Sequence, residues 1–189
     1  MAWNALFGPR PLLSGQTVLT LGTGGVSTFA IQLASAAGAR VISTSSSDTK
    51  LNAIRKLGAS ETINYRIFPE WQDEVLRLTN GRGVDHVVEV GGGGTIERSV
   101  ASTAVGGQIH MVGALSTGTL SPRSLIPWKT LRGIMVGSRA DHEAMNNMIA
   151  YHEIRPLIGS VFPFDQVVEA YRYLESAAHM GKVVIELDA

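Results

Sequence analysis

The sequence predicts an α/β fold in which a doubly wound parallel sheet of six strands carries helices on both faces. Short runs of β-branched apolar residues alternate with amphipathic segments along the whole chain of 189 residues. Several of these runs are apolar throughout, which is typical of parallel strands buried on both sides. Right-handed crossovers between such strands place helices above and below one sheet.

Each element is predicted from its pattern of apolar residues, because strands and amphipathic helices repeat with different periods. The six expected strands cover residues 17–21, 40–44, 61–64, 84–90, 107–112 and 134–136. Helices are expected over 26–37, 47–58, 69–78, from residue 95, and over 141–151 and 165–176. Two further segments, 156–164 and 182–187, are expected to be strands that have no evident partner in the six-stranded sheet.

The composition argues against several classes of protein. Lys and Arg together number 16, as do Asp and Glu, so no net charge draws the chain to nucleic acid or to a membrane surface. The chain has no Cys, and its five His residues show no metal-binding spacing, so we expect no metal site within it. We find neither a signal peptide nor an apolar run of the ~18 residues that a membrane span needs, and we expect a cytoplasmic protein.

The strongest motif is GTGGVS at residues 22–27, which follows an expected strand and opens an expected helix. Gly22 permits the tight turn, and Gly24 lets the backbone approach a pyrophosphate. Gly25 and Val26 begin the helix, whose free N–H groups and positive dipole end attract an anion. Ser27 occupies the third glycine position, where a small residue allows the helix to pack on the strand. In this context the motif predicts a Rossmann-type dinucleotide site.

The end of the second expected strand indicates which coenzyme binds. An NAD-dependent protein has Asp or Glu there, to bind the ribose 2′-hydroxyl. This chain has Thr44, Ser45, Ser46 and Ser47, so a 2′-phosphate meets hydroxyl donors and no negative charge. Lys50 lies one helical turn further on and adds a positive charge. A serine-rich helix cap followed by a solvated Lys is the alternative interpretation, but the three features together favour NADP(H).

Six segments, in this order and spacing, resemble the medium-chain dehydrogenase/reductase superfamily, in its zinc-type alcohol dehydrogenase-like and quinone reductase-like branch. They are AWNALFG, GQTVLTLGTGGVS, KLGASETINYR, GRGVDHVVEVGG, GGQIHMVG and GKVVIEL. The resemblance covers essentially all of this chain, but only the C-terminal, coenzyme-binding portion of such a protein. It implies that a barrel-like N-terminal domain of about 150 residues, which carries most catalytic groups, is missing. We therefore expect an NADP(H)-binding domain, 1–155, and a tail, 156–189, that packs on it as the remnant of the catalytic domain.

The resemblance also implies coenzyme contacts beyond the glycine-rich turn and the serines. These are Tyr65 with Ser45 and Lys50 at the adenosine phosphate, Gly91 and Gly92 beside the nicotinamide ribose, Val112, Gly113 and Ala114 at the carboxamide, and Lys182 near the phosphates. Tyr65 could also simply pack. Glu89 could touch a ribose or be an ordinary strand-end carboxylate.

Histidines offer no further site in this interpretation. His86 and His110 lie inside expected strands and are expected to be packed or hydrogen-bonded in the core, whereas His142, His152 and His179 are expected at the surface. We find no catalytic acid or base.

The function expected from the resemblance is that of an NADP(H)-dependent oxidoreductase, with a small-molecule substrate. Hydride would pass between the nicotinamide and a carbonyl or an activated alkene. The alternative is a truncated, redox-inactive module that binds a nucleotide or a partner. A homo-oligomer is expected, a dimer through the strand region Ile134, Met135, Val136 and Gly137.

Overall fold

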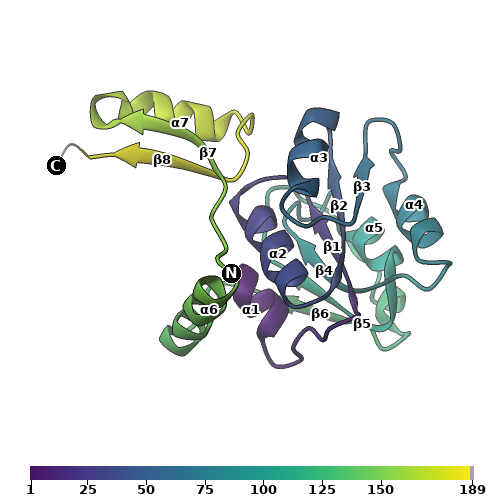
Figure 1. Ribbon diagram of the computed structural model, residues 1–189. Coiled ribbons are helices and arrows are strands. Elements are labelled where there is room, and N and C mark those ends of the chain that lie inside the picture. Colours follow the sequence, from purple (N-terminus) through teal and green to yellow (C-terminus); the bar gives the residue numbers. More distant parts are fainter. Residues whose placement is uncertain (188–189) are drawn as a thin grey trace.

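A six-stranded parallel sheet forms the centre of the computed structural model, which describes residues 1–187 (Figure 1). Its strands are β1 (Thr17–Leu21), β2 (Arg40–Ser45), β3 (Glu61–Asn64), β4 (Val84–Glu89), β5 (Thr103–Met111) and β6 (Thr130–Gly133). They are ordered β3-β2-β1-β4-β5-β6, and all neighbours are parallel. This order confirms the doubly wound Rossmann prediction.

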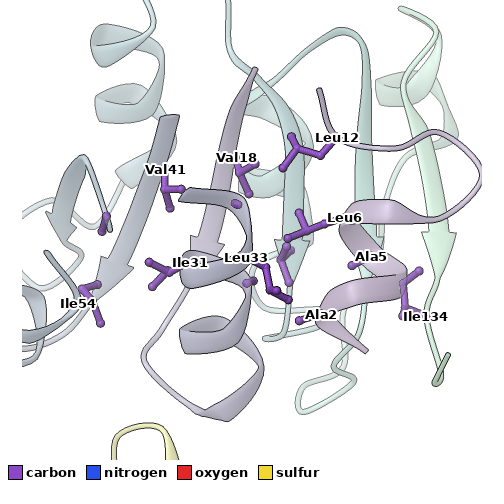
Figure 2. Packing of buried hydrophobic residues seen from close by; sticks show 14 of the residues in the cluster. Ala2, Ala5, Leu6, Leu12, Val18, Ile31, Leu33, Val41, Ile54 and Ile134 are labelled. Atoms are coloured by element: carbon purple, nitrogen blue, oxygen red, sulfur yellow. The ribbon is translucent and has the colours of Figure 1, made fainter. Parts of the chain in front are cut away.

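Helices cover both faces of this sheet. One face carries α1 (Ala2–Phe7), α2 (Gly25–Ala36), α3 (Asp48–Arg55) and α6 (Arg139–Tyr151), and the other carries α4 (Trp71–Leu78) and α5 (Ile96–Ala101). Leu6, Ile31 and Leu33 are fully buried on the first face, where α1 and α2 meet the sheet (Figure 2). Each such side chain contributes about 1.5–3 kcal/mol of transfer free energy, so α1 is an integral part of the core.

Four element predictions were wrong or incomplete. Strand β5 was expected to begin at residue 107 but begins at Thr103. Helix α1 was not predicted, because six residues are too few to show a helical period. The sixth strand was expected at 134–136 but lies at Thr130–Gly133, since an edge strand needs little apolar surface and these residues are half-buried or exposed. Pro69 precedes α4 and its N-cap residue Glu70 rather than opening the helix.

The C-terminal tail forms a small unit of its own, which extends away from the six-stranded sheet (Figure 1). Its strands β7 (Ile158–Pro163) and β8 (Lys182–Glu186) pair in parallel, and η2 (Phe164–Gln166) and α7 (Val167–Glu175) connect them. The two strands expected without a partner therefore pair with each other. The tail touches the sheet domain where Gly181 N–H donates to Thr23 O at 2.9 Å. Residues 188–189 of the expected tail lie outside the described part of the chain.

No helix within residues 1–187 is both long and apolar enough to cross a lipid bilayer.

Candidate functional site

The candidate site is a cavity of about 540 Å³ at the carboxyl ends of the central strands. The chain runs outward from β1 to β3 on one side and from β4 to β6 on the other, so the strand order reverses between β1 and β4. Open α/β sheets bind their ligands in the crevice at this reversal. Ten of the fourteen residues predicted to contact the coenzyme line the cavity: Gly22, Gly24, Gly25, Val26, Ser45, Ser46, Lys50, Tyr65, Val112 and Gly113.

The glycine-rich turn between β1 and α2 forms the floor of this cavity. Gly22 has a φ of +71°, a conformation that other residues adopt only with strain. The Ser27 hydroxyl donates to Leu21 O at 2.6 Å and ties the first turn of α2 to the end of β1. Gly24 is the N-cap of α2, and a Cβ added there would have open space around it. The protein itself therefore does not require glycine at position 24, whereas a ligand on the turn would.

Lys182 places a positive charge above the start of α2. Its side-chain carbons and Nζ lie 3.0 Å from the position that a Cβ on Gly25 would occupy, and Nζ is 5.9 Å from the centre of the Phe29 ring. The adjacent Gly181 bridges to Gly24, so the tail delivers this lysine to the glycine-rich turn. An ammonium group and a helix N-terminus at one point favour a phosphate.

The end of β2 forms the second polar corner. Ser45 is buried, Ser46 and Lys50 are half-buried, and Tyr65 is exposed, with its backbone N–H donating to Ser45 O at 3.0 Å. The Lys50 Nζ donates to two carbonyl oxygens of the tail, Ala177 O at 3.5 Å and His179 O at 3.3 Å. Among the described residues that line the cavity, none is Asp or Glu. The corner is therefore suited to an anion.

The ends of β4 and β5 form the opposite wall. A Cβ on Gly113 would lie only 1.9 Å from Val90 O, so the close approach of the two strand ends requires glycine at this position. Gly91 lines an adjoining cavity of about 390 Å³, which shares Gly22, Tyr65 and Val90 with the first. The other predicted residues line neither of these two cavities: Gly92, Ala114 and Lys182.

Glu89 holds the loop after β4 in place through hydrogen bonds to its carboxylate. Its side chain is fully buried, and Oε1 accepts hydrogen bonds from Gly91 N at 2.7 Å and Gly92 N at 3.0 Å. The hydroxyls of Thr95 and Ser99 also donate to this carboxylate. All four donors to the Glu89 carboxylate belong to the protein. Glu89 therefore supports the wall of the site instead of facing a ribose. Of the two interpretations left open for Glu89, the structure favours the structural one.

Replacing Glu89 with Gln is expected to lower the free energy of unfolding by about 1–2 kcal/mol, because charge-assisted hydrogen bonds are stronger than neutral ones. Urea denaturation measures this change. Glu97→Gln, an exposed carboxylate on the first turn of α5, is the matched control. Equal stability of the two variants would contradict the role given to Glu89.

Two tail residues of the cavity were not identified from the sequence as part of the site, namely Ala177 and His179. His179 was expected at the surface, but it is half-buried and lines the cavity. Burial, and then the nearby Lys50 charge, lower the pKa of His179. Sequence spacing could not reveal this placement, because Lys50 and His179 are far apart in the chain. Their proximity depends on the path of the tail.

Comparison with known proteins places the chain in a family. Residues 25–151 match the family model described as zinc-binding dehydrogenase. A zinc-type alcohol dehydrogenase-like protein of Schizosaccharomyces pombe is 47% identical over 196 residues, which cover 99% of this chain and 57% of that protein. The chain thus spans little more than half the length of this relative.

Solved structures show the same fold. A crystal structure of an NAD-dependent alcohol dehydrogenase superposes with a TM-score of 0.93 at 34% identity, over 99% of this chain and 55% of that one. A mycobacterial protein in complex with NADPH superposes with a TM-score of 0.84 at 27% identity, over 97% and 60% of the respective chains. Structural neighbours thus include proteins described with either coenzyme, and likeness alone does not choose between them.

The residues of this chain do not fit the zinc ion in the family description. The sequence contains no Cys, and the described part of the chain brings no three His, Asp or Glu side chains together as ligands. A zinc site needs three or four such ligands. We therefore derive no step through zinc.

Proposed function

The chain belongs to the zinc-binding dehydrogenase family of the medium-chain dehydrogenase/reductase superfamily, and from this premise we propose that it binds NADP(H) for an oxidoreductase reaction. The observation that carries the proposal is the pairing of two anion-binding corners in one cavity that has no carboxylate among its described lining residues. One corner is the start of α2, where Lys182 packs against Gly25 beside the cavity, and the other is Ser45, Ser46 and Lys50. NADP(H) has a pyrophosphate and a separate 2′-phosphate, and each corner suits one of them.

Each part of the cavity has a binding role in this proposal. The amides at the start of α2 and the Lys182 ammonium would bind the pyrophosphate. Lys50 and the serine hydroxyls would bind the 2′-phosphate, with Tyr65 beside the adenosine. Val112 and Gly113 would orient the nicotinamide end. When bound, the nicotinamide would exchange a hydride with a carbonyl or an activated alkene, and the chain's contribution is to position it.

The rival function is coenzyme binding without turnover. One observation supports this rival. Apart from the N-terminal amine of Met1, the described lining residues that can exchange a proton are Lys50, Tyr65 and His179, and all three lie at the adenosine corner. Incubating the purified chain with NADPH and a panel of aldehydes, enones and quinones separates the two functions. NADPH oxidation that depends on a substrate supports the oxidoreductase. Tight NADPH binding with no oxidation across the panel supports the binding module.

Lys50→Glu is expected to weaken NADPH binding roughly tenfold or more and NADH binding much less. The reversed charge would face the 2′-phosphate, and a charged hydrogen bond contributes about 1.5–3 kcal/mol, where 1.4 kcal/mol corresponds to tenfold. Dissociation constants from coenzyme fluorescence titrations measure both effects. Lys56→Glu makes the same charge change at an exposed position after α3 and serves as the control. Equal loss for both coenzymes would refute the 2′-phosphate assignment.

We also propose a homodimer through the open edge of the sheet. Strand β6 ends the sheet, and the segment after it exposes Met135 and Val136 at 80% and 65%. Exposed strand edges with apolar neighbours favour association. Light scattering is expected to give the mass of a dimer, and Val136→Lys is expected to shift it to that of a monomer. A monomeric mass for the unaltered chain would rule this interface out.

A further inference from the structure

The segment between α7 and β8 forms one wall of the adenosine corner. Ala177 and His179 line the cavity together with Ser45, Ser46 and Lys50. The Lys50 Nζ holds this wall in place through the backbone carbonyls of Ala177 and His179, at 3.5 and 3.3 Å. At its other end, the wall is attached to the glycine-rich turn by the hydrogen bond from Gly181 N to Thr23 O. The backbone that carries His179 is thus held on both sides by residues of the coenzyme cavity.

The His179 ring is neutral and offers one hydrogen-bond donor. Its Nδ1 is buried, and within residues 1–187 no hydrogen bond reaches it. An unpaired buried N–H is rarer and more costly than an unpaired acceptor, which places the single proton on Nε2. Adding a second proton would bury an unpaired N–H beside the Lys50 ammonium, and the pKa of His179 is accordingly lowered. Nε2 therefore remains a donor at neutral pH.

We propose that His179 is a specificity-determining residue that donates a hydrogen bond from Nε2 to the 2′-phosphate of NADP(H). This inference rests on the proposed function. Lys50 alone is an incomplete phosphate site, because the tail carbonyls already take two of its three N–H donors. A neutral imidazole adds a donor without adding the repulsion that a second cation would bring beside Lys50. The tail thereby contributes to both phosphate corners, through Lys182 at one and His179 at the other.

Two small probes isolate this contact, namely adenosine 2′,5′-bisphosphate and AMP, which differ only in the 2′-phosphate. Isothermal titration calorimetry on the full chain measures both. His179→Leu is expected to weaken the bisphosphate about tenfold, the effect of one hydrogen bond to a charged group, and AMP less than twofold. His179→Gln retains an N–H donor and is expected to recover part of the bisphosphate affinity. His152→Leu, at an exposed position after α6, is the matched control.

Each outcome decides between the proposals. If the unaltered chain binds neither probe, both the proposed function and this inference fail. If it prefers the bisphosphate but His179→Leu weakens the two probes equally, or neither, His179 only shapes the wall and this inference fails alone. Thermal melting checks that each variant is folded. Should His179→Leu not fold, His179→Gln compared with His179→Ala decides by the same criterion.

Discussion

A valine in place of Gly24 is expected to abolish coenzyme binding while the protein stays folded. The dissociation constant for NADPH should rise by more than about 100-fold, which corresponds to at least about 2.7 kcal/mol. The free energy of unfolding should change by no more than about 1 kcal/mol, the usual scale for a change of N-cap residue. Calorimetry with NADPH and urea denaturation measure the two quantities on the same sample.

This separation of binding from stability follows from the geometry of the turn. Gly24 has φ −74° and ψ 179°, an extended conformation that a β-branched residue adopts readily. Within residues 1–187, a Cβ there would meet no atom within 4 Å, so the side chain would occupy the open space at the N-terminus of α2. Gly22 offers no such clean test, because its φ of +71° would strain any replacement. At Gly24, only a ligand on the turn makes the added side chain costly.

Gly133→Val is the control for this experiment. Gly133 lies in β6, far along the sheet from the turn, and a Cβ there also has open space and no positive φ. It should leave the NADPH affinity unchanged. If Gly24→Val binds NADPH as tightly as the unaltered chain, the pyrophosphate does not lie on this turn and the proposed site is wrong. Loss of folding in Gly24→Val alone would show that the turn needs glycine for its own structure.

The fold was predictable from the sequence where the local pattern is strong. Strand β3 has the predicted limits, and β1 does as well, because each is a short β-branched run bounded by turn residues. Ser47 or Asp48 was expected to cap α3, and Ser47 is the N-cap, whose hydroxyl accepts from Lys50 N. Strand β6 was misplaced because its pattern, TLRG, carries little apolar signal, whereas the apolar residues after it lie partly at the surface.

The candidate site was predictable only where its residues are close in sequence or belong to a known motif. The glycine-rich turn and the serines of β2 are local, and both line the cavity. His179 and Ala177 reach it through the path of the tail, which no local pattern encodes. The role of Glu89 was equally hidden, because it depends on four donors that gather around one carboxylate only in the folded chain.

A second large effect is expected from two buried histidines on neighbouring strands, His86 of β4 and His110 of β5. His86 Nδ1 lies 3.0 Å from His110 Nε2, and both rings are almost completely buried. His86 Nε2 is 3.2 Å from Gln16 Oε1, an oxygen that also accepts from Leu13 N and is therefore an acceptor. Gln108 Nε2 lies further away, at 3.5 Å from His86 Nε2, and already donates to Arg10 O, so the shorter contact to Gln16 places the proton of His86 on Nε2. The proton of His110 is then also on Nε2, pointing at His86 Nδ1. Both rings are neutral.

Protonating either ring would disrupt this arrangement. A second proton on His86 would face the N–H of His110, and a second proton on His110 would occupy Nδ1, which is buried without a partner among the described residues. Burial lowers the pKa of His86 to about 4 and that of His110 to about 3. The neighbouring charges of Arg10 and Arg132 lower the pKa of His110 further. Both values lie below the 6.5 of an unfolded histidine.

The lowered pKa values of His86 and His110 make the folded protein less stable as the pH falls. Below pH 6.5 the two histidines bind protons in the unfolded chain but not in the folded chain. Their contribution to stability is therefore fully present above this pH and is lost as the pH falls towards 4 and 3. Each ring contributes ~1.4 kcal/mol per pH unit, so the two together should cost about 4 kcal/mol between pH 8 and pH 5. That is a large share of the roughly 5–15 kcal/mol that stabilise a typical domain. Carboxylates contribute little in this window, because they titrate at lower pH.

Urea denaturation at several pH values between 8 and 5 measures this loss, and combining His86→Gln with His110→Leu removes its cause. The amide introduced by His86→Gln would keep a donor for Gln16, and the double variant should lose most of the slope in this window. His179, whose pKa is also lowered, contributes to the slope that is left. The exposed His142 provides the control, since His142→Gln should leave the slope unchanged. Titration of the imidazole protons by NMR gives the two pKa values directly, even if the double variant is too unstable to use. Ordinary values near 6.5, or an equally steep profile in the double variant, would show that the pair does not set the acid limit of this fold.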